Sequence, residues 1–153
     1  MKSDEQYMRQ CIGQAQAASA RGEVPVGALV VNPVNGEVLA RAGNAPIGIC
    51  DPTAHAEILA LRDAAYKTDN YRLSGLILYV TLEPCTMCAG AISNARIGRV
   101  VYGAPDAKGG AVAHGVRFFE SAACHSKPEI TGGVLADECG QILKDFFKAR
   151  RGK

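Results

Sequence analysis

The chain lacks any long apolar run. Its longest, Val24–Val31, has eight residues and contains a proline and a glycine, whereas a helix that crosses a bilayer needs about 20 apolar residues. The first six residues are polar and acidic, so the apolar core of a secretory signal is missing there as well. These absences predict a protein of the cytoplasm with no membrane contact.

A strong net charge is also missing. Seventeen Lys and Arg against fifteen Asp and Glu give a formal charge of +2, which excludes a strongly basic nucleic-acid coat protein. The charge is nonetheless uneven, because residues 144–153 hold five basic residues and one acidic residue. They carry +4, and the first 143 residues therefore carry −2. A basic end of this kind fits either a local anionic partner or a solvated helix end whose cations face the helix dipole.

The composition shows no bias toward disorder, collagen or coiled coil. Hydrophobic residues make up 48% of the chain and charged residues 21%, as in ordinary globular proteins. A chain of 153 residues has room for one compact domain with a sizeable core. We therefore expect a single domain that spans residues 1–153.

Helical and strand patterns alternate along the chain. The capping box Ser3-x-x-Gln6 predicts a helix that ends near Gly22. Three further helices are predicted, over 54–66 with Thr53 as its cap, over 86–95, and from Ala136 onward. Strands are predicted over 26–31, 37–42, 76–82 and 99–102, the first two joined by a hairpin at Asn35-Gly36, and residues 103–127 as loops with one short helical piece. This alternation predicts an α/β fold with a mostly central sheet.

The six cysteines do not form a disulfide framework in this prediction, because nothing directs the chain to an oxidising compartment. Cys11 and Cys139 lie on apolar helical stripes and are expected in the core. Cys85 and Cys88 form the one C-x-x-C pair, and their spacing is typical of zinc ligands.

Two motifs carry the chemistry, His55-Ala56-Glu57 and Pro84-Cys85-Thr86-Met87-Cys88. Each opens a predicted helix, so the two helix N-termini, which favour thiolate over thiol, can face one ion. Two thiolates and one imidazole leave the fourth zinc position open for water, as catalytic zinc requires, and zinc can lower the pKa of that water to about 7. Glu57 would move protons without being a ligand. Because residues i and i+2 do not share a helix face, this requires His55 and Glu57 to lie in the first turn.

Other polar residues offer competing assignments. Cys50 precedes His55 by five residues and is an alternative ligand, and Cys124-His125 is an alternative second site. Asp106 and His114 lie in the glycine-rich loop, where we expect His114 to be an exposed polar residue.

The two motifs together resemble the zinc-dependent cytidine deaminase superfamily. Within it, the chain resembles the bacterial tRNA-specific adenosine deaminases over nearly its whole length, although the stretch 110–128 departs from their pattern. The matching blocks are Glu23–Ala28, Asn44, Asp51–Ile58, Thr81–Ala91, Arg96–Gly103, Leu135–Cys139 and Asp145–Phe147.

The resemblance implies roles for individual residues. His55, Cys85 and Cys88 match the ligands of one Zn²⁺ per chain, and Glu57 matches the proton shuttle. Asn44 matches the residue that hydrogen-bonds the purine, and the backbone of Ala56 and the side chain of Val26 match the base pocket. The implied RNA contacts are Asp106 for the flanking nucleotides, and Phe146, Phe147 and the basic residues after them, among them Arg150, for the anticodon loop.

The resemblance also implies a fold and a reaction. The fold is a three-layer α/β sandwich with a central five-stranded mixed sheet and helices on both faces, and the enzyme is a homodimer. The reaction is hydrolytic deamination of adenosine to inosine at the wobble position of a tRNA anticodon, with the anticodon stem-loop as partner.

Two other functions compete with this one. A deaminase of a free base or nucleoside, of guanine or cytosine type, would share every zinc residue but would have no use for the basic Phe-Phe tail. A non-catalytic RNA-binding module with structural zinc would need a fourth protein ligand. Glu57 argues against such a module, because it would have no role there.

Overall fold

The Asn35-Gly36 hairpin is present in the computed structural model, which describes residues 1–151. It joins β1 (Gly27–Asn32) to β2 (Glu37–Gly43) as an antiparallel pair, and Gly36 takes the positive φ of 74° that the tight turn requires. The pairing shifts register between Val30 and Val31, so a bulge bends β1 near its end.

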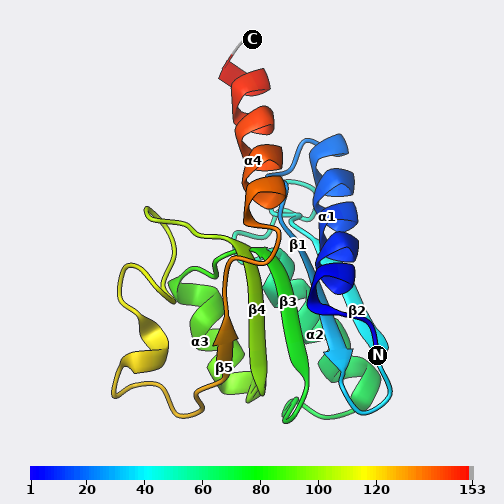
Figure 1. The fold of residues 1–153 in the computed structure, drawn as a ribbon, viewed down its shortest axis with the longest axis vertical. Coiled ribbons are helices and arrows are strands. Elements are labelled where there is room, and N and C mark those ends of the chain that lie inside the picture. Colours follow the sequence, from blue (N-terminus) through cyan, green and yellow to red (C-terminus); the bar gives the residue numbers. More distant parts are fainter. Residues whose placement is uncertain (152–153) are drawn as a thin grey trace.

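The sheet has five strands in the order β2-β1-β3-β4-β5. The strand β3 (Ile77–Leu82) pairs antiparallel with β1 and parallel with β4 (Arg99–Ala104), and β4 pairs parallel with β5 (Glu129–Thr131). The parallel half places the carboxyl ends of β3 and β4 at one edge of the sheet, where the chain leaves each strand for a loop (Figure 1).

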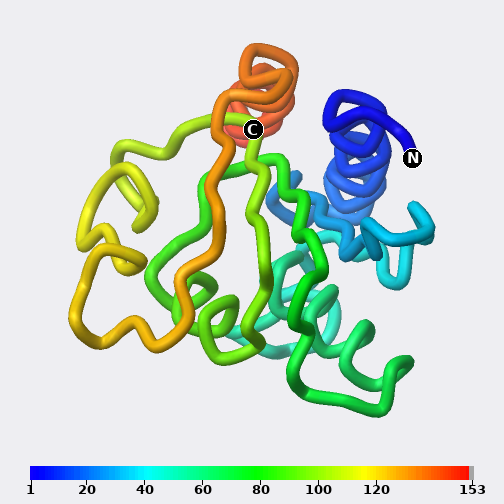
Figure 2. Tube along the Cα trace, turned by 60° about the horizontal axis from the view of Figure 1, so that its bottom comes forward, coloured from blue at the N-terminus to red at the C-terminus, as the bar shows by residue number. Residues whose placement is uncertain are grey.

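Helices cover both faces of the sheet, which gives three layers (Figure 2). On one face lie α1 (Asp4–Ala20) and α4 (Ala136–Arg151), and on the other lie α2 (Ala56–Thr68) and α3 (Thr86–Ala95). The predicted capping box of α1 is confirmed, since the Ser3 hydroxyl accepts the Gln6 N–H at 3.2 Å and the Gln6 side chain accepts the Ser3 N–H at 2.8 Å. The predicted three-layer mixed-sheet fold is therefore the observed one.

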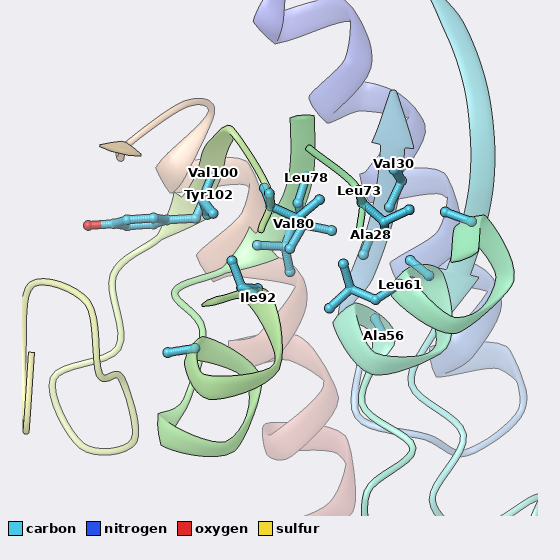
Figure 3. Close-up of a cluster of buried hydrophobic side chains, with 14 of the residues drawn as sticks. Ala28, Val30, Ala56, Leu61, Leu73, Leu78, Val80, Ile92, Val100 and Tyr102 are labelled. Atoms are coloured by element: carbon cyan, nitrogen blue, oxygen red, sulfur yellow. The ribbon is translucent and has the colours of Figure 1, made fainter. Parts of the chain in front are cut away.

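Strand residues alternate between two apolar cores because successive side chains point to opposite faces. Ala28 and Val30 of β1 pack with Val80 of β3 against α2 and α3 (Figure 3), whereas Leu29 and Tyr79 pack against α1 and α4. The second core also holds Cys11 and Cys139, as their apolar stripes predicted.

A polar network fastens the start of α1 to the sheet. The Asp4 carboxylate accepts hydrogen bonds from Arg99 Nη1 at 3.0 Å, Arg99 Nη2 at 2.7 Å and the Tyr79 hydroxyl at 2.8 Å. Arg99 Nη2 also donates to the Thr131 hydroxyl on β5 at 3.0 Å. The Arg99 guanidinium holds the pKa of Asp4 below its usual value, which is the mark of a stabilising ion pair.

Two local features differ from the prediction. The prediction that Thr53 caps the second helix is wrong, because His55 is the N-cap of α2 and Thr53 instead donates its N–H and its hydroxyl to Asp51 Oδ1 at 2.8 and 2.7 Å. The sequence patterns did not predict the short strand β5. The one short helical piece predicted within 103–127 is present as the 3₁₀ turn η1 (Phe118–Glu120). Over residues 1–151, no helix is both long and apolar enough to span a membrane.

Candidate active site

Two helices begin at the site, and each begins at a motif residue. His55 is the N-cap of α2 and Cys85 is the N-cap of α3, both with extended backbone conformation and neither with a side-chain cap hydrogen bond. Their side chains are therefore free to turn away from their own helices toward a shared point. The sequence favours this geometry because β3 ends at Leu82, and Pro84, which has no N–H with which to extend the ladder, stands directly before Cys85.

Three ligand-type atoms converge there. His55 Nδ1 lies 3.6 Å from Cys85 Sγ and 3.5 Å from Cys88 Sγ, and all three atoms lie within 4.8 Å of one another. No other set of His, Cys, Asp and Glu side chains in residues 1–151 qualifies as a metal group. Cys50 is exposed and its thiol donates to the Ile47 carbonyl, while Cys124 contacts Ser93 and Ser126.

The electrostatics of the group favour a thiolate. The hydrogen bond from the Cys88 thiol, helped by His55, lowers the pKa of Cys85 to about 4, and the same bond raises the pKa of Cys88. The pKa of His55 is raised, mainly by its hydrogen bond to Cys85. The three residues thus share protons that a cation would displace.

The group fits a zinc ion. One imidazole nitrogen and two sulfurs are the donor types that zinc prefers, and three ligands leave one tetrahedral position for a small molecule. Cys88 is fully buried while His55 and Cys85 are half-buried, so the ion would have a protein side and an open side.

Glu57 lies in the first turn of α2 and is buried beside the His-Cys-Cys group. It is the second residue of α2, two after the N-cap His55, so both side chains belong to the first helical turn, as the H-x-E geometry demanded. The residue is only 4% exposed. Burial raises the pKa of Glu57 to about 7, the range in which a carboxyl group can both take and give protons.

Asn44 is held rigidly beside the same helix start. Its Oδ1 accepts the Ala56 N–H at 2.7 Å, and its backbone N–H donates to the Val26 carbonyl at 3.1 Å. Among the described residues nothing accepts from Asn44 Nδ2, although the residue is 7% exposed. Asn44 can therefore offer a hydrogen-bond donor to a ligand, while the Ala56 N–H is already engaged. Val26 itself is buried.

The residues expected to contact RNA lie on two other elements. Asp106 is in the loop after β4, and its carboxylate accepts the N–H groups of Lys108 and Gly109. On α4, Phe146 is buried at 8% exposure and Phe147 is 43% exposed. Arg150 stacks over the Phe146 ring at 4.9 Å and donates to a backbone carbonyl of the turn after α1 at 3.4 Å. The aromatic available to a partner is therefore Phe147.

Sequence reasoning missed two buried carboxylates. Glu23 accepts the N–H groups of Ile47 and Gly48 at 3.1 and 2.7 Å. Glu83 pairs with His114 at 2.8 Å, which corrects the expectation that His114 is merely an exposed loop residue. Burial acts to raise the pKa of Glu83, but hydrogen bonds from the loop outweigh it and the pKa is lowered. Both glutamates stand inside matched motifs, yet only the fold shows which loops they hold.

The chain is similar to known proteins over nearly its whole length. The family model described as MafB19-like deaminase matches residues 2–151. The chain is 49% identical to a tRNA-specific adenosine deaminase of Agrobacterium fabrum over 95% of this chain and 94% of that protein. It is 42% identical to the tRNA-specific adenosine deaminase of Bacillus subtilis over 100% of this chain and 94% of that one.

Solved structures show the same likeness. A tRNA A34 deaminase studied for A-to-I editing at the wobble position is 49% identical and superposes with a TM-score of 0.88, over 90% of this chain and 99% of that chain. A guanine deaminase from Nitrosomonas europaea, 24% identical, superposes with a TM-score of 0.78 over 95% and 85% of the two chains. The second likeness concerns the fold alone.

Proposed function

The chain belongs to the MafB19-like deaminase family, and on that premise we propose that it is a tRNA adenosine deaminase that converts the wobble adenosine of an anticodon to inosine. One observation carries this most directly. Relatives named for tRNA-specific adenosine deamination match across nearly all of both chains, so that the likeness includes the substrate-facing elements as well as the chemical centre. The match over residues 2–151 also supports one deaminase domain for the whole chain.

We propose that His55, Cys85 and Cys88 hold one Zn²⁺ per chain. Their convergence within 4.8 Å and their donor chemistry support this. When bound, zinc would supply a Lewis acid that lowers the pKa of a coordinated water to about 7. The N-termini of α2 and α3 both point their partial positive charge at the group, which favours the two thiolates.

Glu57 would carry the protons of the reaction. Water adds at C6 of the adenine, and Glu57 accepts a proton from it and delivers one to the ring nitrogen N1. Glu57 then assists transfer of a proton to the amino group, which leaves as ammonia, so that adenosine and water give inosine and ammonia. The burial that raises the pKa of Glu57 suits both directions of transfer.

Asn44 would orient the base. Its Nδ2 can donate to an acceptor nitrogen of the purine, while its Oδ1 stays fixed on the Ala56 N–H. The buried Val26 side chain would form part of the apolar wall beside the base. The target base must leave its stack to reach these groups, as in other base deaminases.

Recognition of the anticodon stem-loop would use α4 and the loop after β4. The last turn of α4 carries Lys148, Arg150 and Arg151, and Phe147 is exposed just before them. Phosphates suit the cations and an unstacked base suits the ring. Asp106 would meet the nucleotides that flank the target. We propose that an enzyme that acts on tRNA in this way works in the cytoplasm. The resemblance also implies a homodimer, which light scattering of the purified protein would test.

A substrate panel tests the proposed function. Free adenine, guanine and cytosine, their nucleosides, and an anticodon stem-loop with adenosine at the wobble position are each assayed for ammonia release. We expect release from the stem-loop alone. Release from a free base or nucleoside, with none from the stem-loop, would instead identify a small-molecule deaminase.

A further inference from the structure

The loop that follows β4 is held by a single buried carboxylate. Residues 106–114, called here the 106–114 loop, surround Glu83, whose side chain is 0% exposed. Glu83 Oε1 accepts the Asp106 N–H at 3.1 Å and pairs with His114 Nδ1 at 2.8 Å. Oε2 accepts the N–H groups of Val112, Ala113 and His114 at 3.1, 3.0 and 3.2 Å. Five donors from one loop therefore converge on one side chain.

The same carboxylate belongs to the turn that carries a predicted metal ligand. Glu83 N–H donates to the Ala104 carbonyl at the end of β4 at 2.8 Å. The Pro84 carbonyl accepts the Ala111 N–H of the loop at 2.9 Å, and the next residue is Cys85. The loop and the ligand turn are thus joined along their backbones as well as through the carboxylate.

Gly110 permits this close approach. A Cβ atom added there would lie 2.5 Å from the Asp106 carbonyl and closer still to Glu83 Oε2. Since real Cβ atoms do not approach other atoms so closely, any side chain at this position must push the loop away from Glu83. The fit between the glycine and the carboxylate is therefore a built feature of the site.

The loop in turn fixes Asp106. One oxygen, Oδ1, accepts the N–H groups of Lys108 and Gly109 at 3.1 and 2.9 Å, while the backbone N–H of the same residue is held by Glu83. The direction of the Asp106 carboxylate therefore depends on where Glu83 holds the loop.

Glu83 itself cannot act on substrate, because both of its oxygens are buried and engaged. We propose that Glu83 is a positioning residue that holds the 106–114 loop against the turn before Cys85 and so sets the enzyme's selectivity for the nucleotides flanking the target adenosine. This inference rests on the proposed function, because it names a specificity determinant of that same site.

Two variants perturb the contact from opposite sides. Glu83→Gln keeps the shape of the side chain but replaces one acceptor oxygen by a donor amide, so one group of loop N–H donors loses its partner. Gly110→Ala leaves Glu83 intact and inserts a methyl group between it and the loop. Gly13→Ala is the matched control, because a Cβ at Gly13 on α1 meets nothing within 4 Å.

The first readout needs no substrate. Amide hydrogen exchange of the purified protein should speed up at residues 112–114 in both loop variants and stay unchanged in Gly13→Ala.

The second readout is enzyme kinetics with the stem-loop as substrate. Each loop variant should raise KM for the stem-loop by about tenfold, the size expected when a displaced Asp106 loses one to two hydrogen bonds to the RNA. We expect kcat to change less, with metal content unchanged. Discrimination between stem-loops that differ only in the flanking nucleotides should shrink, and the double variant should be no worse than the more severe single variant.

Several results would overturn the proposal. One is an amide exchange rate at residues 112–114 that stays at the wild-type value in both loop variants. Another is unchanged discrimination between stem-loops that differ in the flanking nucleotides. A third is a double variant whose increase in KM equals the sum of the two single effects in free energy. Failure of both loop variants to fold would assign Glu83 to stability alone and would also overturn it. A wild-type protein that does not deaminate the stem-loop would refute the proposed function instead, and the exchange measurement would still decide whether Glu83 holds the loop.

Discussion

Glu57→Gln separates proton transfer from metal binding. The substitution preserves the size of the side chain at a residue that is 4% exposed, so the first turn of α2 should keep its packing and the His55–Cys85–Cys88 group its geometry. Gln cannot exchange protons at neutral pH. Turnover should therefore collapse while about one zinc per chain remains bound.

The size of the fall in kcat depends on whether another carboxylate can replace Glu57 as the base. General acid–base catalysis typically contributes about 10²–10⁴-fold, and a substitute base could moderate the loss. The other buried carboxylates cannot substitute, because Glu23 is engaged by Ile47 and Gly48 and Glu83 by the 106–114 loop. We therefore expect a fall in kcat toward the upper end of that range, with KM for the stem-loop little changed.

The assay is steady-state inosine formation from the stem-loop, with zinc measured on the same sample. Asp63→Asn, on the exposed side of the same helix, is the control and should retain full activity and metal. If Glu57→Gln keeps kcat within about tenfold of wild type, the assignment of proton transfer to Glu57 is refuted. Loss of zinc would make Glu57 a ligand.

Four other changes test separate parts of the account. Cys85→Ser should lose zinc and activity and lower the melting temperature, because metal binding to the folded site adds to folding free energy. Asn44→Ala should reduce kcat/KM at unchanged metal content, and leaving the buried Ala56 N–H without an acceptor should cost about 1–3 kcal/mol of stability. Asp4→Asn should lose about 1.5–3 kcal/mol of unfolding free energy at pH 7. Because the pKa of Asp4 is lowered on folding, that difference should be present above pH 3.8 and fade on further acidification, as chemical denaturation at several pH values would show. Phe147→Ala should weaken stem-loop binding by an amount consistent with about 1–3 kcal/mol per stacked base and should lower the melting temperature only slightly, since the ring is 43% exposed and packs edge-to-face on Phe146.

The convergence of His55, Cys85 and Cys88 could be predicted from the sequence because its determinants are local. Pro84 follows the end of β3, and Cys85 and Cys88 are one helical turn apart. His55 and Glu57 lie within one first turn. Each of these placements depends on residues only a few positions away, so it can be recognised from the sequence alone.

The surroundings of the centre were less predictable because they depend on distant contacts. The strand β5 has three residues and is stabilised by pairing with β4, so its own sequence carries little strand signal. Thr53 looks like a helix cap, but its hydroxyl is engaged by Asp51 and the helix begins later. The bond between Glu83 and His114 joins residues 31 positions apart across a loop of irregular conformation. The periodicity of apolar residues, which predicts helices and strands, cannot predict such a contact.

The most direct test of the central claim is to locate the product in RNA. Purified protein is incubated with an anticodon stem-loop that carries adenosine at the wobble position in an unpaired loop, and the digested RNA is analysed by mass spectrometry. The account predicts inosine at the wobble position and at no other adenosine, with formation abolished by Glu57→Gln. An unchanged stem-loop, together with ammonia release from a free base or nucleoside, would contradict it.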